Sequence, residues 1–135
     1  MFSRIKRAII EYRELRYLAY HDPLTGLLNR TWLYKNIDQI NTIYVYFIDI
    51  NGLHEINKKG HTFGDDHIKK AIATIRHHGI LLRYAGDEFL LFSNYKNEVS
   101  TNDLFCVGRS MICQDIETAI NTADAEMIKA KIDRH

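Results

Sequence analysis

The 135-residue chain has few of the features that mark secreted, membrane-spanning or nucleic-acid-binding proteins. Its two cysteines, Cys106 and Cys113, form neither a CxxC motif nor a disulfide-rich pattern, and the chain has no signal peptide and no apolar run of membrane-spanning length. A reduced cytoplasmic protein is therefore predicted. The formal net charge is only +1, so the chain lacks the basic excess of a general nucleic-acid binder, and no nucleic-acid polymer is expected as its partner.

Proline is also scarce, and there is no repeat, linker or low-complexity tract. With 46% hydrophobic residues the chain can bury one core, without room for a separate sensor domain. Residues 1–20 have apolar groups at helical spacing and are predicted to form a lead-in helix before a domain at 21–135. Between Arg4 and Arg16 the chain has five basic and two acidic residues. A solvated face on a packing or coiled-coil helix is favoured there over a membrane-surface helix.

The rest of the chain alternates between helical and strand patterns. The only proline lies in residues 21–30, which break the first helix before a second at 32–40. Residues 43–50 are β-branched and aromatic almost throughout, as in a strand covered on both faces. Further patterns predict a helix after residue 65, strands at 80–84, 88–92 and 103–113, and a helix at 115–132. The fold class expected is α/β, with a mixed central sheet and flanking helices.

Acidic residues occupy unusual places in two of these strands. Asp49 is near the end of the strand at 43–50, whereas Asp87 and Glu88 follow a tight turn centred on Ala85 and Gly86, where Gly86 is expected to have any positive φ. Antiparallel pairing of the two strands would bring the three carboxylates together, and a cation would then be needed to offset their repulsion. Oxygen ligands of this kind suit Mg²⁺ or Mn²⁺. Considered alone, each of these three acidic residues also fits the alternative of a solvent-exposed residue in a turn.

Two more polar residues flank the segment KKGHTFG. Asn57 offers a carbonyl and an amide to a purine edge, and the Asp65 carboxylate can accept two N–H bonds. Guanine presents such a pair of N–H groups, which adenine lacks. The alternative for Asp65 is an N-cap of the following helix.

Five segments in order now resemble one family, the GGDEF-domain diguanylate cyclases, from about residue 21 to 134. DPLTGLLNR matches the family's D-x-L-T-G-L-x-N-R, and GHTFGD its G-H-x-x-G-D. DINGLHEIN, RYAGDEF and ADAEMIKAK are similar to its D-[IL]-D-x-F-K-x-[IV]-N, its R-[YF]-G-G-[DE]-E-F and its A-D-x-A-[LM]-Y-x-A-K. The resemblance implies a nucleotide-cyclase or palm-like fold and condensation of two GTP into cyclic di-GMP with release of pyrophosphate.

The resemblance also implies roles for residues. The metal ligands would be Asp49, Asp87, Glu88 and the Ile50 carbonyl, and Glu88 is alternatively a group that readies the attacking hydroxyl. The residues expected to bind GTP are Asn57, Asp65, Gly52, Leu53, His54, Gly86, Lys131 and Arg134. Asn57 and Asp65 would read guanine, while the Gly52 and Leu53 amides and Lys131 would hold phosphates. Asp49, Asp87 and Glu88 would be catalytic, with Mg²⁺ or Mn²⁺ as cofactor.

Three departures from the family pattern stand out. Ala85 replaces the first glycine of GGDEF, and His54 replaces a lysine. A long crossover helix of the family has no counterpart between Phe92 and Asp103, which predicts a minimised domain with one sheet face less covered and apolar surface exposed. No pair among the seven histidines has an established zinc-ligand spacing, so a zinc site is not expected.

The leading hypothesis is thus a minimal diguanylate cyclase. Two alternatives stay open: a GTP- or cyclic-dinucleotide-binding signalling module without turnover, and a cyclase that makes a different cyclic purine dinucleotide. A cyclic dinucleotide needs two 3′-hydroxyls that attack each other's α-phosphate. A homodimer, stable or transient, is therefore predicted, with the 1–20 helix and the exposed sheet surface as its drivers.

Overall fold

The apolar segment at residues 43–50 forms the strand β2, which is buried from its second residue onward. The computed structural model describes residues 2–134, so Met1 and His135, the ends of the two predicted regions, lie outside it. The elements in chain order are α1 (Phe2–Tyr20), β1 (Leu28–Asn29), α2 (Arg30–Lys35), η1 (Ile37–Gln39), β2 (Tyr44–Ile50), α3 (Leu53–Asn57), α4 (His61–Ala73), β3 (Ile80–Ala85), β4 (Glu88–Ser93), β5 (Phe105–Met111) and α5 (Ile116–Arg134).

Within the described residues, five strands form one mixed sheet in the order β1-β3-β4-β2-β5. The strand β2 runs antiparallel to both β4 and β5, whereas β1 runs parallel to β3. In the β2–β4 register Asp49 stands opposite Glu88. The antiparallel pairing that would bring the acidic strands together is therefore present, and it places these carboxylates at one end of the sheet.

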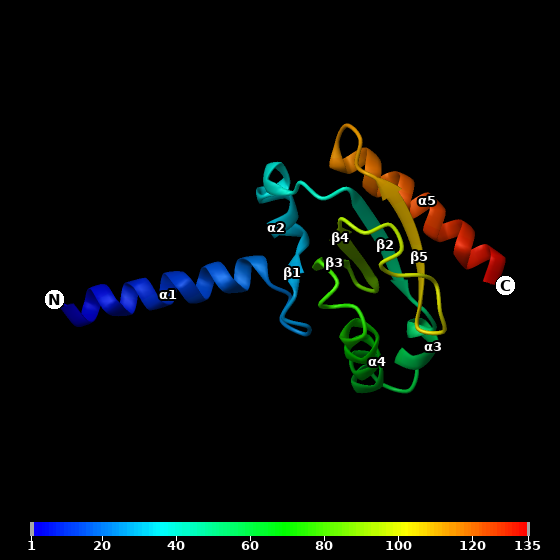
Figure 1. The fold of residues 1–135 in the computed structure, drawn as a ribbon. Coiled ribbons are helices and arrows are strands. Elements are labelled where there is room, and N and C mark those ends of the chain that lie inside the picture. The colour runs from blue at the N-terminus through cyan, green and yellow to red at the C-terminus, as the bar shows by residue number, and fades with distance from the viewer. Residues whose placement is uncertain (1, 135) are drawn as a thin grey trace.

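Helices cover both faces of this sheet, as predicted (Figure 1). On one face, α4 packs Ile68 and Ile72 onto a core that includes Ile48 and Phe89. On the other face, α5 and α2 cover a second core, to which α5 contributes Ile120 and Met127 among others. The helix α5 lies along β5 and β2, so its C-terminal end reaches the edge of the sheet where Asp49 is located.

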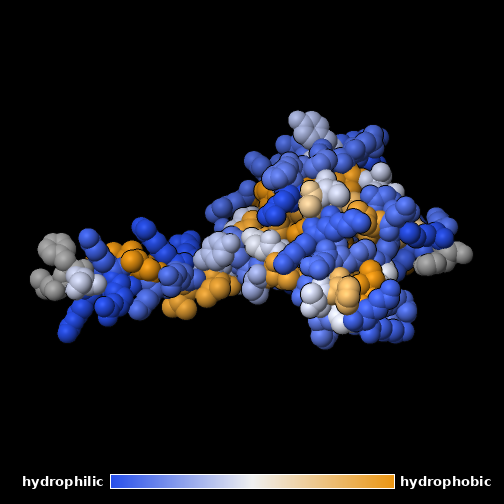
Figure 2. All heavy atoms as spheres, turned by 90° about the horizontal axis from the view of Figure 1, so that it is seen from below, coloured by the Kyte–Doolittle hydropathy of each residue, from blue (hydrophilic) through white to orange (hydrophobic). Residues whose placement is uncertain are grey.

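The predicted lead-in helix is confirmed as α1, which projects away from the sheet (Figure 1). Its apolar side chains are largely exposed, and orange spheres mark several of them along the projecting helix in Figure 2. The exposed members are Ile5, Ile9, Ile10, Tyr12, Leu15, Tyr17 and Leu18. No helix in the described part of the chain is both long and apolar enough to cross a membrane.

The connection between β4 and β5 contains no helix, as predicted, but the expected exposure of the sheet face beneath it is wrong. Tyr46 on that face is 1% exposed. Its hydroxyl donates to the Tyr95 carbonyl and accepts from the Glu98 N–H at 3.2 Å, which ties residues 94–104 over the sheet. A contact of 2.6 Å between His78 Nδ1 and the Glu98 carboxylate anchors the same connection to the segment between α4 and β3.

The tight turn of the β3–β4 hairpin also differs from expectation. Ala85 belongs to β3 and pairs with Glu88, so the turn consists of Gly86 and Asp87, next to a shift in register between Arg83 and Ala85. Gly86 does not have a positive φ; among the described residues only Gly26, Gly52 and Gly60 do. The bulge between Arg83 and Ala85 accounts for this difference, because it shifts the two-residue turn from Ala85 and Gly86 to Gly86 and Asp87.

The close contact of α5 with β5 generates a first prediction. A Cβ at Gly108 would lie 1.9 Å from the Ala123 carbonyl oxygen and 2.2 Å from the Met127 nitrogen, both in the backbone of α5. Gly108→Ala should therefore lower the free energy of unfolding by about 3 kcal/mol or more, as overpacking against a rigid backbone does. The matched control is Gly86→Ala, whose Cβ meets no atom within 4 Å and should change stability by less than about 0.5 kcal/mol. Urea denaturation of both variants checks this, and equal stabilities would contradict it.

Candidate active site

A cleft of about 470 Å³ lies between the β2–α3 turn, the β3–β4 turn and the C-terminal end of α5. We call it the β2–α3 cleft. The predicted site residues that line it are Ile50, Gly52, Leu53, His54, Asp87, Lys131 and Arg134. The lining residues that the sequence did not single out are Asn51, Glu55 and Asp103. The other predicted residues, Asp49, Asn57, Asp65, Gly86 and Glu88, do not line the cleft, although Asp49 is bonded to Lys131, which does.

Asp49 is the buried acid of the site, with 5% of its surface exposed at the end of β2. One carboxylate oxygen, Oδ2, accepts a hydrogen bond of 2.6 Å from the Lys131 ammonium. The other, Oδ1, is buried and has no hydrogen-bond partner among the described residues. Burial, and then repulsion by Asp87, raise the pKa of Asp49 despite the bond from Lys131. One oxygen of the Asp49 carboxylate is therefore paired with Lys131, and the other has no partner.

Asp87 and Glu88 are placed by the hairpin. The Ile50 amide donates to the Asp87 carbonyl at 3.0 Å, so the turn is fastened to the end of β2. Burial raises the pKa of Glu88, and Asp87, Asp49 and Asp124 add to the effect by repulsion. The hydrogen bond to Asp49 raises the pKa of Lys131, which therefore stays charged. Negative charge gathers at this corner, with Lys131 as the nearest compensating cation.

A divalent cation fits this donor set. The orphaned Asp49 Oδ1, the Asp87 carboxylate and the Ile50 carbonyl are hard oxygen ligands, which Mg²⁺ and Mn²⁺ prefer. Residues 2–134 contain no ready-made group of three Asp, Glu, His or Cys ligands for a metal. Such a cation would accordingly depend on a backbone carbonyl, water and substrate oxygens for the rest of its shell.

The β2–α3 turn is held rigidly from three sides. The Asn51 amide donates to the Leu104 carbonyl at 2.8 Å, and its side chain donates to the Asn102 carbonyl at 3.1 Å. His67 on α4 bonds the Asn51 carbonyl at 3.0 Å, and the buried Cys106 thiol donates to Asn51 Oδ1 at 3.3 Å. Gly52 follows with a φ of +69°, which favours glycine. The amides expected to hold phosphates thus belong to a preorganised turn.

Asn57 lies against the helix turn that contains Asp65, at the corner between α3 and α4. A Cβ built on Gly64 would lie 1.7 Å from Asn57 Oδ1, so the Asn57 side chain rests directly on Gly64, the residue before Asp65. The N-cap of α4 is Gly60, and Asp65 lies inside the helix. The alternative of an N-cap for Asp65 is therefore wrong, and its carboxylate is left for another role.

Sequence reasoning missed the clamp formed by Arg83 and Asp22. Arg83 donates to both carboxylate oxygens of Asp22 at 3.1 Å and to the Gly86 carbonyl at 2.6 and 3.0 Å. Asp22 also accepts from the Thr25 amide and hydroxyl. Burial raises the pKa of Asp22, but the Thr25 and Arg83 bonds outweigh it and hold the pKa below its ordinary value. The signal was present in the sequence, since both residues belong to the segments that resemble the family.

The buried charge of Asp49 generates a second prediction. Because its pKa is raised on folding, the folded chain binds more protons, and stability is lost as pH rises from the ordinary value of 3.8 through the raised pKa. At neutral pH, Asp49→Asn should therefore unfold at the same or a higher temperature than the wild type, with the difference shrinking as pH falls toward 4. Thermal unfolding at several pH values checks this.

The same variant tests the cation site. Mg²⁺ should raise the unfolding temperature of the wild type, because a ligand that binds the folded state stabilises it, and should leave Asp49→Asn unchanged. A variant that is clearly less stable than the wild type at neutral pH would show that the Lys131 ion pair outweighs the cost of burying the charge.

Comparison with known proteins identifies the family of the chain. Residues 19–114 match the family described as diguanylate cyclase, GGDEF domain. An uncharacterized protein of Mycobacterium tuberculosis is 33% identical over 102 residues, which cover 67% of this chain and 16% of that protein. Diguanylate cyclase DgcP of Escherichia coli is 28% identical over 122 residues, covering 81% of this chain and 35% of DgcP. The chain therefore spans well under half the length of these curated relatives.

Cyclic di-GMP phosphodiesterase PdeR of Escherichia coli is 32% identical over 91 residues, or 59% of this chain and 14% of PdeR. Among solved structures, the coiled coil and GGDEF domain of DgcB from Caulobacter crescentus, in complex with c-di-GMP, superposes with a TM-score of 0.81. The superposition covers 98% of this chain and 91% of the DgcB chain. At 17% sequence identity it supports the fold alone. With the family match extending over most of the described residues, the chain belongs to the GGDEF domain family of diguanylate cyclases.

Proposed function

We propose that this domain is a diguanylate cyclase that condenses two GTP into cyclic di-GMP and releases pyrophosphate. The observation that carries the proposal is Asp49, whose buried Oδ1 lacks a partner while Asp87 faces the same corner. A buried carboxylate oxygen without a partner, next to a second carboxylate, is costly for the fold even when Lys131 pairs with the other oxygen, and a bound cation and nucleotide would explain its place. The family match and the name of the relative DgcP support the same reaction.

In this mechanism Asp49, Asp87 and the Ile50 carbonyl would hold Mg²⁺ or Mn²⁺, and the bound cation would supply stabilisation of the charge that develops on the α-phosphate. Glu88, whose pKa is raised, accepts or relays the proton of the attacking 3′-hydroxyl. The 3′-oxygen forms a bond to the α-phosphorus, the bond from that phosphorus to the bridging oxygen breaks, and pyrophosphate leaves. The reaction takes place twice for each cyclic dinucleotide.

The substrate is held by three groups of residues. The amides of Gly52 and Leu53 lie on the rigid β2–α3 turn and bind phosphates, helped by His54. Lys131 is 52% exposed at its side chain, so its ammonium can contact phosphate oxygens from its position on Asp49. Arg134 lines the same cleft and extends this positive side.

A binding module without turnover is the second candidate. Residues 2–134 contain no preassembled group of three metal ligands, and Lys131 occupies one oxygen of Asp49. The relative PdeR bears the name of a phosphodiesterase, so a matching segment also occurs in a protein named for a different activity. Such a module would bind GTP or cyclic di-GMP and form no product.

One experiment separates the proposals. The pure protein is incubated with Mg²⁺ or Mn²⁺ and with GTP, ATP or both, and the products are identified by mass spectrometry. We expect cyclic di-GMP from GTP, no product from ATP, and at least a hundredfold loss in Asp49→Asn and Asp87→Asn, because neutral amides are poor metal ligands. Asp66→Asn, on the exposed face of α4, is the control and should be fully active. GTP binding without product would favour the binding module, and a mixed or adenine product would favour another cyclase.

Assembly is part of the proposal, because one domain supplies one GTP and the reaction needs two facing sites. With the sheet face covered by residues 94–104, the remaining driver is the exposed apolar surface of α1. Two chains would meet through α1, in a stable or transient homodimer. In the same assay, specific activity should rise with enzyme concentration and fall when residues 1–18 are removed.

The contact of Asn57 with Gly64 generates a prediction about guanine binding. A methyl group at Gly64 must displace the exposed Asn57 side chain, while alanine favours a helix over glycine by about 1 kcal/mol. Gly64→Ala should therefore keep or raise stability and weaken GTP binding about tenfold, as expected for a displaced base contact. Calorimetric titration with GTP and thermal unfolding check the two effects, with Asp66→Ala on the same helix as control. Unchanged GTP affinity would remove Asn57 from the proposed site.

A further inference from the structure

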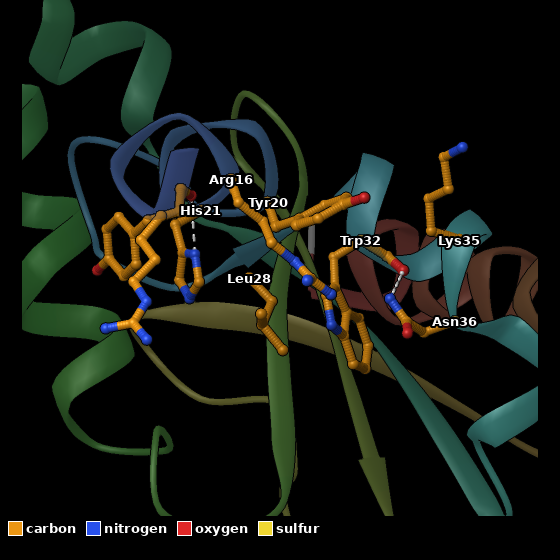
Figure 3. Close-up of a pocket in the computed structure, with 9 residues that line it drawn as sticks. Arg16, Tyr20, His21, Leu28, Trp32, Lys35 and Asn36 are labelled. Atoms are coloured by element: carbon orange, nitrogen blue, oxygen red, sulfur yellow. Dashed lines mark hydrogen bonds between the residues drawn. The ribbon is translucent and has the colours of Figure 1, made fainter. Parts of the chain in front are cut away.

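A second pocket, of about 540 Å³, lies between the C-terminal half of α1 and the helix α2 (Figure 3). We call it the α1–α2 pocket. It lies at the β1 edge of the sheet, and β3 and β4 separate β1 from the strand that contains Asp49. The two sites share no lining residue. The residues that line the pocket are Arg13, Arg16, Tyr17, Tyr20, His21, Leu28, Trp32, Lys35 and Asn36.

The inner part of the pocket is apolar and aromatic. Tyr20, Leu28 and Trp32 are half-buried and surround the same space in Figure 3. Asn29 fixes this arrangement, since its side chain donates to the Ala19 carbonyl at 2.9 Å and accepts from the Trp32 amide at 3.0 Å. The end of α1 and the start of α2 are thus joined through one residue, and the aromatic walls are held in place before any ligand arrives.

The rim of the pocket is positively charged. Arg13, Arg16 and Lys35 line it with exposed side chains, and no carboxylate is among the lining residues. None of the three forms an ion pair within residues 2–134, whereas Arg83 and Lys131 elsewhere in the domain each pair with an aspartate. Three unpaired cations beside stacking surfaces suit a ligand that has both a ring and an anionic group.

We propose that the α1–α2 pocket binds a nucleoside phosphate. The base stacks against Trp32 and Tyr20, and the phosphate oxygens contact Arg16 and Lys35 at the rim, with Arg13 close by. A nucleotide is favoured over a simple anion because the inner walls are aromatic, and over an apolar ligand because the rim has three cations. Since the ligand would contact both helices, it would fix the direction in which α1 leaves the domain. This site is independent of the proposed cyclase reaction.

The chain contains a single tryptophan, so its fluorescence reports on this pocket alone. The 135-residue chain, kept free of metal to suppress nucleotide binding in the β2–α3 cleft, is titrated with AMP, adenosine and inorganic phosphate separately. AMP should change the Trp32 fluorescence saturably, with each fragment at least about tenfold weaker because it forms only part of the contacts. Arg16→Ala and Lys35→Ala should each weaken AMP binding about tenfold, whereas Lys69→Ala, an equal loss of charge on α4, should not.

Trypsin digestion gives a second readout, because bound AMP should slow cleavage after Arg13 and Arg16. Lys131→Ala, which removes the proposed phosphate contact of the β2–α3 cleft, should bind AMP like the wild type, and a loss of binding in that variant would assign the signal to that cleft. The proposal is overturned if AMP gives no change up to millimolar concentration, if phosphate alone binds as tightly as AMP, or if Arg16→Ala and Lys35→Ala bind AMP normally. A fluorescence change with protein concentration alone would show instead that a second copy of the chain fills the pocket.

Discussion

The contact of one guanidinium with two turns determines the geometry of the candidate site. Arg83 joins the Asp22 carboxylate to the Gly86 carbonyl, so the segment after α1 and the β3–β4 turn are fixed to each other. Because Asp87 follows Gly86 and its carbonyl accepts from the Ile50 amide, the same clamp also sets where β2 ends. A bidentate bond between charged groups is stronger and more directional than a neutral one, which suits a turn that must present a carboxylate at a defined place.

The acidic residues that this clamp positions lower the stability of the folded domain, and the same charges favour the binding of a ligand. Asp49 is buried with one oxygen unbonded, and burial, followed by repulsion between neighbouring carboxylates, raises the pKa of Asp49 and Glu88. Lys131 offsets part of the charge from the C-terminal end of α5, a helix that packs tightly on β5 at Gly108. The fold thus brings a helix end and a strand end together at a place where charge remains unbalanced, a common arrangement in functional sites.

Local pattern was enough to predict the longer strands and the main helices, because alternation and helical spacing are local properties. The pairing of Asp49 with the AGDEF strand was only a condition of the metal-site hypothesis, which the structure meets. It was not enough for the two-residue β1, which depends on its partner β3, or for the turn at Gly86 and Asp87, which depends on a bulge. The family resemblance pointed to residues of the cleft, such as Lys131 and His54, that lie far apart in sequence. It did not reveal that Asn51 is held by Leu104, His67 and Cys106, since those contacts form only on folding.

The helix-free connection over residues 94–104 makes the two faces of the sheet unequal. One face is sealed by the 19-residue α5, whereas part of the other is sealed by a loop. That loop is attached through the Tyr46 hydroxyl, through Arg109, which donates to the Lys96 carbonyl and the Asn97 side chain, and through Val99 and Leu104, which pack on the core. A loop lacks the repeated backbone hydrogen bonds of a helix, so it can open at a lower free energy than the domain unfolds. The connection runs directly into Asn102 and Leu104, which hold the β2–α3 turn, so opening of the loop and the order of that turn are physically coupled. In this shortened domain a loop replaces a helix as the cover of one face, and local opening of that loop would reach the candidate active site.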